Sequence, residues 1–197
     1  MHRKTLHEYA DEWWSVALRG LLAVVAGIAV YLSPIPHADH LLRVFGAYMI
    51  VDGLIELFIT VQAVRQRQSW LRPGINGVLG VVFGLFNVIG GGLPVVVRGD
   101  LVAVRTFISG ISSFVLARQV RTELPDDLPE WLLQLTALVS IVFSVIIFVG
   151  PAIEARIVGK LDWLAALYLI GLGVLLLVIA ARLRAVSRIP AGAATHS

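Results

Sequence analysis

Residues 41–64 read LLRVFGAYMIVDGLIELFITVQAV and contain the two features that decide the fold. The stretch is mostly apolar, and a helix of this length, rising about 1.5 Å per residue, is long enough to cross a hydrocarbon core of about 30 Å. Two acids, Asp52 and Glu56, nevertheless lie inside it. An ionised carboxylate in the bilayer core costs roughly 2.5 to 3.5 kcal/mol, so both side chains are expected to face protein rather than lipid.

Polar residues recur every four positions along this predicted helix. Tyr48, Asp52, Glu56 and Thr60 are spaced in this way, so they form one polar stripe that drifts slowly round the helix. Such a stripe predicts contact with a neighbouring helix of the same protein.

Composition places the whole chain in the membrane. Of its 197 residues 58% are hydrophobic and 15% are charged, and the mean hydropathy is +0.86, well outside the range of soluble domains. The chain has no cysteine, which excludes disulfides, cysteine-ligated zinc and iron–sulfur clusters. We expect no cofactor or metal, no nucleic-acid partner and, because no catalytic motif occurs, no enzymatic activity.

Six apolar segments can be drawn, each of a length that spans a bilayer, and none shows the alternation typical of strands. They predict an all-α membrane protein with a single domain over residues 1–197 and tails at 1–12 and 185–197. The segments are approximately 14–33, 41–64, 72–89, 101–118, 131–150 and 161–183.

The basic residues predict the orientation of these helices. Ten of them fall on the side of the two tails and of every second loop, namely Arg3, Lys4, Arg65, Arg67, Arg72, Arg118, Arg121, Arg182, Arg184 and Arg188. The other side has Arg98, Arg156 and Lys160 in its loops. Because cytoplasmic loops are enriched in Lys and Arg, both termini are expected in the cytoplasm of a bacterial cell, with the helices in its cytoplasmic (inner) membrane.

The chain also reads as three copies of a helical hairpin of about 60 residues, the kind of internal repeat that defines an architecture. Trp14, Trp70 and Trp131 each open the first helix of a unit. Small residues recur at heptad spacing, and in lipid such positions let helices approach closely. The glycines predicted to serve helix packing are Gly20, Gly27, Gly46, Gly53, Gly77 and Gly84.

These motifs resemble the HdeD family of bacterial inner-membrane proteins, which are built from short hydrophobic hairpin repeats. The first pattern is W-x5-G-x6-G-x6-P from Trp14 to Pro34, followed by A-Y-x3-D-G-x2-E from Ala47 to Glu56 and by W-x6-G-x6-G from Trp70 to Gly84. The similarity covers residues 13 to about 184. The third unit departs from the pattern, with Leu138 and Ser144 near the glycine positions. The resemblance implies a multi-pass protein connected with acid stress, and it implies no defined substrate.

Arg19 is the predicted partner of the acids. By helical rise, Arg19 and Glu56 lie at similar depths, so we predict an ion pair between them. Asp52 would then lie nearer the midplane, with the Tyr48 hydroxyl as its hydrogen-bond partner. Arg105 is predicted near the outer end of its helix, where it could pair with a loop acid or reach the lipid headgroups.

Two interpretations of the polar stripe remain open. Asp52 and Glu56 could take part in proton transfer, or they could hold helices together without a chemical role. For the whole protein, the first hypothesis is a role in acid or envelope stress resistance. The alternatives are a small proton-coupled transporter or channel, and an accessory subunit of a membrane complex. The expected partners are the lipid bilayer and either further copies of the chain or other membrane proteins.

Overall fold

The computed structural model describes residues 13–33, 38–67, 70–90, 92–123, 130–153 and 155–187. Within these ranges the chain forms six helices and no strand, and every helix is long and apolar enough to cross a membrane. The helices are α2 (Trp13–Tyr31), α3 (Ala38–Arg65), α4 (Leu71–Ile89), α5 (Val95–Glu123), α6 (Glu130–Ile153) and α7 (Ala155–Ser187). The predicted fold class, an all-α membrane protein with six spanning helices, is confirmed. The predicted tail 1–12 lies outside the described residues, as does the chain after Ser187.

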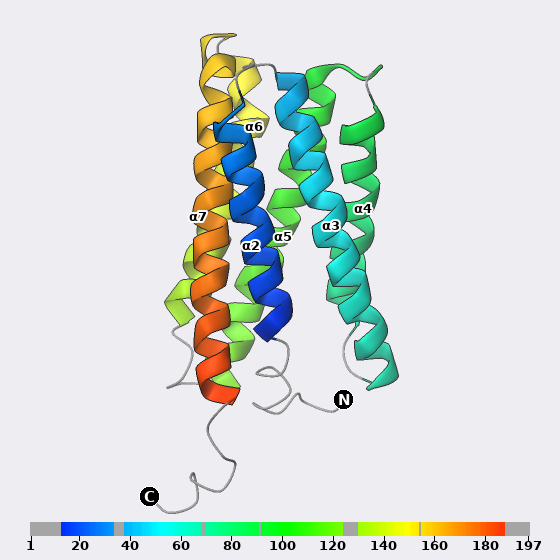
Figure 1. Ribbon diagram of the computed structural model, residues 1–197, viewed down its shortest axis with the longest axis vertical. Coiled ribbons are helices and arrows are strands. Elements are labelled where there is room, and N and C mark those ends of the chain that lie inside the picture. The colour runs from blue at the N-terminus through cyan, green and yellow to red at the C-terminus, as the bar shows by residue number, and fades with distance from the viewer. Residues whose placement is uncertain are drawn as a thin grey trace, which may run out of the picture.

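The six helices run alternately up and down as one bundle (Figure 1). The start of α2 and the finish of α7 lie at the same end, which we call the terminal end, at the bottom of Figure 1. The most extensive contacts join α2 with α7, α3 with α4, and α5 with α6. Contacts between the two helices of each predicted hairpin are less extensive. The closest packing therefore joins helices of consecutive units, and it joins the last helix, α7, with the first, α2.

Small residues explain these three close pairs. A Cβ atom added at Gly53 of α3 would lie 2.7 Å from the Gly77 carbonyl oxygen of α4, and one at Gly20 of α2 would lie 2.9 Å from the Gly173 carbonyl oxygen of α7. At Gly110 of α5 it would lie 3.2 Å from a carbonyl oxygen of α6. Because no side chain intervenes, the backbones approach closely, which is how helices associate in lipid.

The remaining glycines of the predicted set lie at the α2–α7 and α3–α4 crossings. Gly27 faces Ala166 and Ile170 of α7, and Gly46 and Gly84 face each other across the α3–α4 crossing. In the third unit the small residue opposite Gly110 is Ala137. Leu138, which the sequence placed near that position, is 58% exposed and points away from the bundle.

Helix α5 begins six residues earlier than the sequence predicted. The first turn starts directly after Pro94, where the Arg98 amide donates to the Pro94 carbonyl at 3.2 Å. Proline is well suited to a helix start because it has no amide hydrogen to satisfy. Arg98, predicted in a loop, is therefore helical, and Arg105 lies ten residues into α5 rather than close to its start.

Candidate functional site: a buried ionic cluster beside a central cavity

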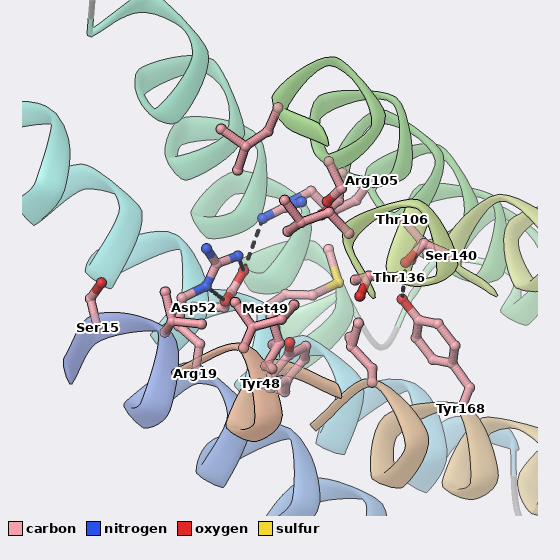
Figure 2. A pocket seen from close by; sticks show the side chains of 18 of the residues that line it. Ser15, Arg19, Tyr48, Met49, Asp52, Arg105, Thr106, Thr136, Ser140 and Tyr168 are labelled. Carbon is pink, nitrogen blue, oxygen red and sulfur yellow. Dashed lines mark hydrogen bonds and ion pairs between the residues drawn. The ribbon is translucent and has the colours of Figure 1, made fainter. Parts of the chain in front are cut away.

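Four charged side chains from three helices meet inside the bundle. Arg19 comes from α2, Asp52 and Glu56 come from α3, and Arg105 comes from α5. Figure 2 shows Arg19, Asp52 and Arg105 pointing toward one another. We call these four residues the ionic cluster. The side chains of both acids are 6% exposed, that of Arg105 is 5% exposed and that of Arg19 is 22% exposed.

Each acid in the cluster is bound by both arginines. The Nε atom of Arg19 donates to Oδ1 of Asp52 at 2.5 Å, and its Nη2 lies 3.0 Å from Oε1 of Glu56. The Nη2 atom of Arg105 donates to Oδ2 of Asp52 at 3.0 Å and to Oε2 of Glu56 at 3.1 Å. Two positive and two negative charges therefore balance, which is what a group of charges needs in a span that excludes water.

The helical repeat of α3 places the two acids for this arrangement. Residues four apart lie one above the other on a helix, so Asp52 and Glu56 present their carboxylates to the same neighbours. Arg19 enters from α2 and Arg105 from α5, so the cluster links helices of three different close pairs. The predicted ion pair between Arg19 and Glu56 is present, and Arg19 binds Asp52 as well.

Arg105 is the member of the cluster that the sequence analysis misplaced. It was expected near the outer end of its helix, but the early start of α5 carries it into the bundle, where it binds both acids. Gly80 of α4 makes room for it, since a Cβ atom there would lie 3.3 Å from the Arg105 Nε. The sequence contained a signal for this contact. Two carboxylates in one apolar span need two positive charges for balance, and Arg19 supplies only one.

A cavity of about 220 Å³ lies beside the cluster at the centre of the bundle. Arg19, Asp52 and Arg105 line it together with the hydroxyl-bearing residues Ser109 and Ser113 of α5. Its lining continues toward the terminal end of the bundle, where it includes Leu116 of α5, Leu133 in the first turn of α6 and Leu183 near the end of α7.

An aromatic stack lies on the other side of the cavity. The rings of Phe143 and Tyr168 are parallel within 4°, with centroids 3.9 Å apart, and Phe45 stacks on both at 6.0 and 6.3 Å. The Tyr168 hydroxyl lies 3.2 Å from the Ser140 hydroxyl. Figure 2 shows the two side chains pointing toward each other. Phe45 precedes Asp52 by two helical turns, so the stack lies farther from the terminal end than the cluster does.

Tyr48 lies at the wall of the cavity, one turn from Asp52, and packs edge-on against Phe45 with ring centroids 6.3 Å apart. Its predicted hydrogen bond to Asp52 is replaced by the two arginines. In the portion of the chain that the structure describes, no hydrogen bond joins the Tyr48 hydroxyl to Asp52. Thr60, the last member of the stripe, donates its hydroxyl to the Glu56 carbonyl at 2.8 Å and does not reach the cluster.

A second buried arginine lies at the end of the bundle opposite the termini. Arg98 is 1% exposed, and its guanidinium group bonds to the Asp39 carboxylate and to the Asn87 carbonyl oxygen. The starts of α3 and α5 are thereby tied to the last turn of α4. Arg43 also binds Asp39, at 2.8 Å, but its side chain is 55% exposed.

Arg98 and Arg43 share one acid but differ in burial, so they provide a matched pair of substitutions. We expect Arg98→Gln to lower the free energy of unfolding by about 1 to 3 kcal/mol, because the Asn87 carbonyl loses a buried donor. Arg43→Gln should change it by less than about 1 kcal/mol, as is usual for exposed ion pairs. Unfolding of both variants in mixed detergent micelles would measure the difference. Equal effects would show that the bonds from Arg98 to α3 and α4 add no more stability than the exposed ion pair of Arg43.

Within the ranges that the structure describes, no group of three His, Asp or Glu side chains comes together in a way that could ligate a metal ion. The arrangement presents two carboxylates bound by two guanidinium groups, and guanidinium and hydroxyl groups line the cavity beside them.

Comparison with known proteins identifies the repeat. Two stretches, residues 18–89 and 75–149, match the family model described as a short repeat of unknown function (DUF308). The chain belongs to this family. No curated protein and no solved structure matches it. The HdeD proteins that the sequence resembles are members of the DUF308 family. The sequence predicted an internal repeat in three copies, and the family model confirms the repeat in two overlapping stretches.

The two DUF308 matches begin 57 residues apart, and this offset shows how the ionic cluster breaks the repeat. Gly20 and Gly77 are related by it, as are Gly53 and Gly110, so the packing positions are kept. The cluster positions are not kept. At this offset the counterparts of Arg19, Asp52, Glu56 and Arg105 are Asn76, Ser109, Ser113 and Tyr48. The DUF308 repeat therefore supplies the scaffold, and the charges belong to individual copies.

Proposed function

We propose that this DUF308 protein acts in the cytoplasmic membrane of a bacterium in resistance to acid or envelope stress, with the ionic cluster as its working element and no catalytic activity. The proposal includes both termini on the cytoplasmic side, in line with the ten basic residues on that side. The resemblance to the HdeD family supports the connection with acid stress.

The burial of the ionic cluster is the observation that carries the proposal. Replacing buried ion pairs by well-packed apolar residues is often neutral or stabilising, so a bundle held together by glycine crossings gains little stability from four charges. Ionisable residues within a membrane are functional by default. The two carboxylates lie beside a cavity, where a change in their protonation would alter the balance of charge.

The first experiment measures survival at low external pH of a strain lacking this protein, complemented with wild type, Asp52→Asn or Glu56→Gln at matched membrane levels. We expect wild type to restore survival and both variants to lower it at least tenfold, because each removes one negative charge from the cluster. Asp100→Asn, which changes an acid of α5 outside the cluster, serves as the control and should behave as wild type.

Equal rescue by all four proteins would assign the cluster to packing and would contradict a proton-linked role. No rescue by any of them would separate this chain from acid resistance. A requirement for another protein, seen by co-purification together with loss of function when that protein is removed, would favour an accessory subunit.

A small proton-coupled transporter or channel is the second candidate, and the cavity favours it. Lining residues extend from the ionic cluster toward the terminal end, and Phe45 and Tyr168 of the aromatic stack line the cavity farther from that end. A cavity that opens to one side of the membrane at a time is what an alternating-access cycle requires. Proton uptake by liposomes containing wild type but not Asp52→Asn protein would support this candidate.

A further inference from the structure

The central cavity reaches from the ionic cluster to the terminal end of the bundle. Its lining includes residues in the first turn of three helices that begin at that end, namely Ser15 of α2, Arg72 of α4 and Leu133 of α6. Along α5 the lining extends from Arg105 to Leu116, which is about 16 Å at a rise of about 1.5 Å per residue. The cavity is therefore an elongated space that begins near one end of the bundle and finishes inside it.

The aromatic stack closes the opposite end of the cavity. Phe45 and Tyr168 line the cavity there. Val102 and Leu169 belong to the same buried cluster of apolar residues and are 1% and 0% exposed. Arg98, which is also buried, lies one helical turn beyond Val102 on α5. In the described part of the chain, packed side chains therefore separate the cavity from the end opposite the termini.

Three hydroxyl groups at the wall of the cavity lack a partner within the protein. Among the described residues, no hydrogen bond is made by the side chains of Tyr48, Ser109 and Ser113, and all three line the cavity. Internal cavities with polar groups in need of partners hold water, whereas the cavities that stay empty are apolar. A volume of about 220 Å³ has room for roughly seven waters, because one water occupies about 30 Å³ in the liquid.

We propose that water fills the central cavity, that it enters from the terminal end only, and that it reaches Asp52, the acid of the ionic cluster that lines the cavity. Because it names the ligand that reaches the ionic cluster, this inference rests on the proposed function of that cluster. With both termini in the cytoplasm, as proposed above, the water belongs to the cytoplasmic side. The aromatic stack then separates the cluster from the outer solution.

Single cysteines can test the inference, because the chain has no cysteine of its own. Ser109→Cys and Ser113→Cys place a thiol at the wall of the cavity with little change of volume. The probe is Ag⁺, a small cation that crosses lipid poorly and bonds to the thiolate form of cysteine. A thiol in apolar surroundings stays protonated and does not react. Reacted thiols are counted by their protection from a fluorescent maleimide that is added later in SDS.

Three control cysteines report the side of the membrane and the surroundings of the thiol. Gln66→Cys changes an exposed residue just beyond the end of α3, so it shows which side of a vesicle the terminal end faces. Val102→Cys changes a residue that is buried beside the aromatic stack, and Ile111→Cys changes one that is 45% exposed on the outside of the bundle. Neither Val102 nor Ile111 lines the cavity, so both variants should react at least tenfold more slowly than Ser109→Cys.

The reaction is measured on the full-length protein in right-side-out and in inverted membrane vesicles. We expect Ser109→Cys and Ser113→Cys to react with Ag⁺ added on the side where Gln66→Cys reacts, and at least tenfold more slowly when it is added on the other side. Two cavity positions keep the test decisive if one variant does not insert. Reaction as slow as that of Val102→Cys from both sides would show a dry cavity and overturn the inference. Equal reaction from both sides, or faster reaction from the side opposite Gln66→Cys, would also overturn it.

The outcome is separable from that of the acid-survival experiment. Dependence of survival on Asp52 together with an unreactive Ser109→Cys would reject the water-filled cavity and keep the proposed function. Reaction of Ser109→Cys from the terminal side together with equal survival of wild type and Asp52→Asn would do the reverse.

Discussion

Replacing Arg105 by glutamine is expected to lower the free energy of unfolding by about 3 to 5 kcal/mol, the range observed when one partner of a buried ion pair is removed. Arg105 donates to Asp52 at 3.0 Å and to Glu56 at 3.1 Å, and both acids are almost completely buried. Without Arg105 the cluster has two carboxylates and one guanidinium group, so one buried negative charge is left without a partner.

The control for this prediction is Arg118→Gln on the same helix. The Arg118 guanidinium lies over the Phe114 ring at 4.9 Å, and its residue is exposed. An exposed cation–π contact is worth about 0.5 to 1 kcal/mol, so this variant should remain close to wild type. Both can be compared by circular dichroism as the SDS fraction of mixed micelles is raised. An equal effect of the two substitutions would show that the buried acids do not depend on Arg105 for charge balance.

A double variant then separates loss of charge balance from loss of packing. Arg105→Gln with Asp52→Asn removes one charge of each sign and leaves Arg19 with Glu56 as a neutral pair. We expect it to recover at least half of the stability lost in Arg105→Gln, because neighbouring charges couple strongly and their effects are not additive. Additive losses would mean that the four residues do not act as a unit.

The second large effect is expected at the crossing of α7 with α2. Gly173→Leu should lower the free energy of unfolding by about 3 kcal/mol or more, at or above the upper end of the usual range for overpacking. A Cβ atom at Gly173 would lie 2.6 Å from the Gly20 carbonyl oxygen and 2.8 Å from the Val24 amide nitrogen. These are backbone atoms, so the only relief is to separate the helices.

Gly171→Leu is the matched control for Gly173→Leu, two residues away on the same helix. A Cβ atom at Gly171 would meet nothing within 4 Å. Leucine there should be neutral or stabilising by up to about 1 kcal/mol, because it has a higher helix propensity than glycine. Comparable losses at both positions would show that the α2–α7 crossing does not depend on a small residue.

These predictions concern two different sets of contacts between helices. Glycine crossings hold the three close helix pairs together, and the ionic cluster joins helices that belong to different pairs. Stability measurements on Arg105 and Gly173 test the two sets separately, whereas the acid-survival experiment tests the function of the ionic cluster.

The sequence by itself determined the six spanning helices, because length and apolarity leave a segment in lipid few other conformations. It also indicated the packing role of Gly20 and Gly53, since small residues at heptad spacing mark a close approach whatever the partner. The contact between Arg19 and Glu56 could be predicted because α2 and α3 are consecutive helices joined by a short loop, and helical rise places the two residues at similar depths.

The tertiary structure alone decided which helices pack together and which side chains form the ionic cluster. Spacing along one helix specifies a face but not the neighbour that covers it, so the pairing of α2 with α7 and of α3 with α4 was not visible in the sequence. The position of Arg105 depends on where α5 begins and on the room at Gly80. The start of α5 follows Pro94, which is a signal in the sequence, but the room at Gly80 depends on packing. The neutral cluster beside the central cavity exists only once α2, α3 and α5 have come together.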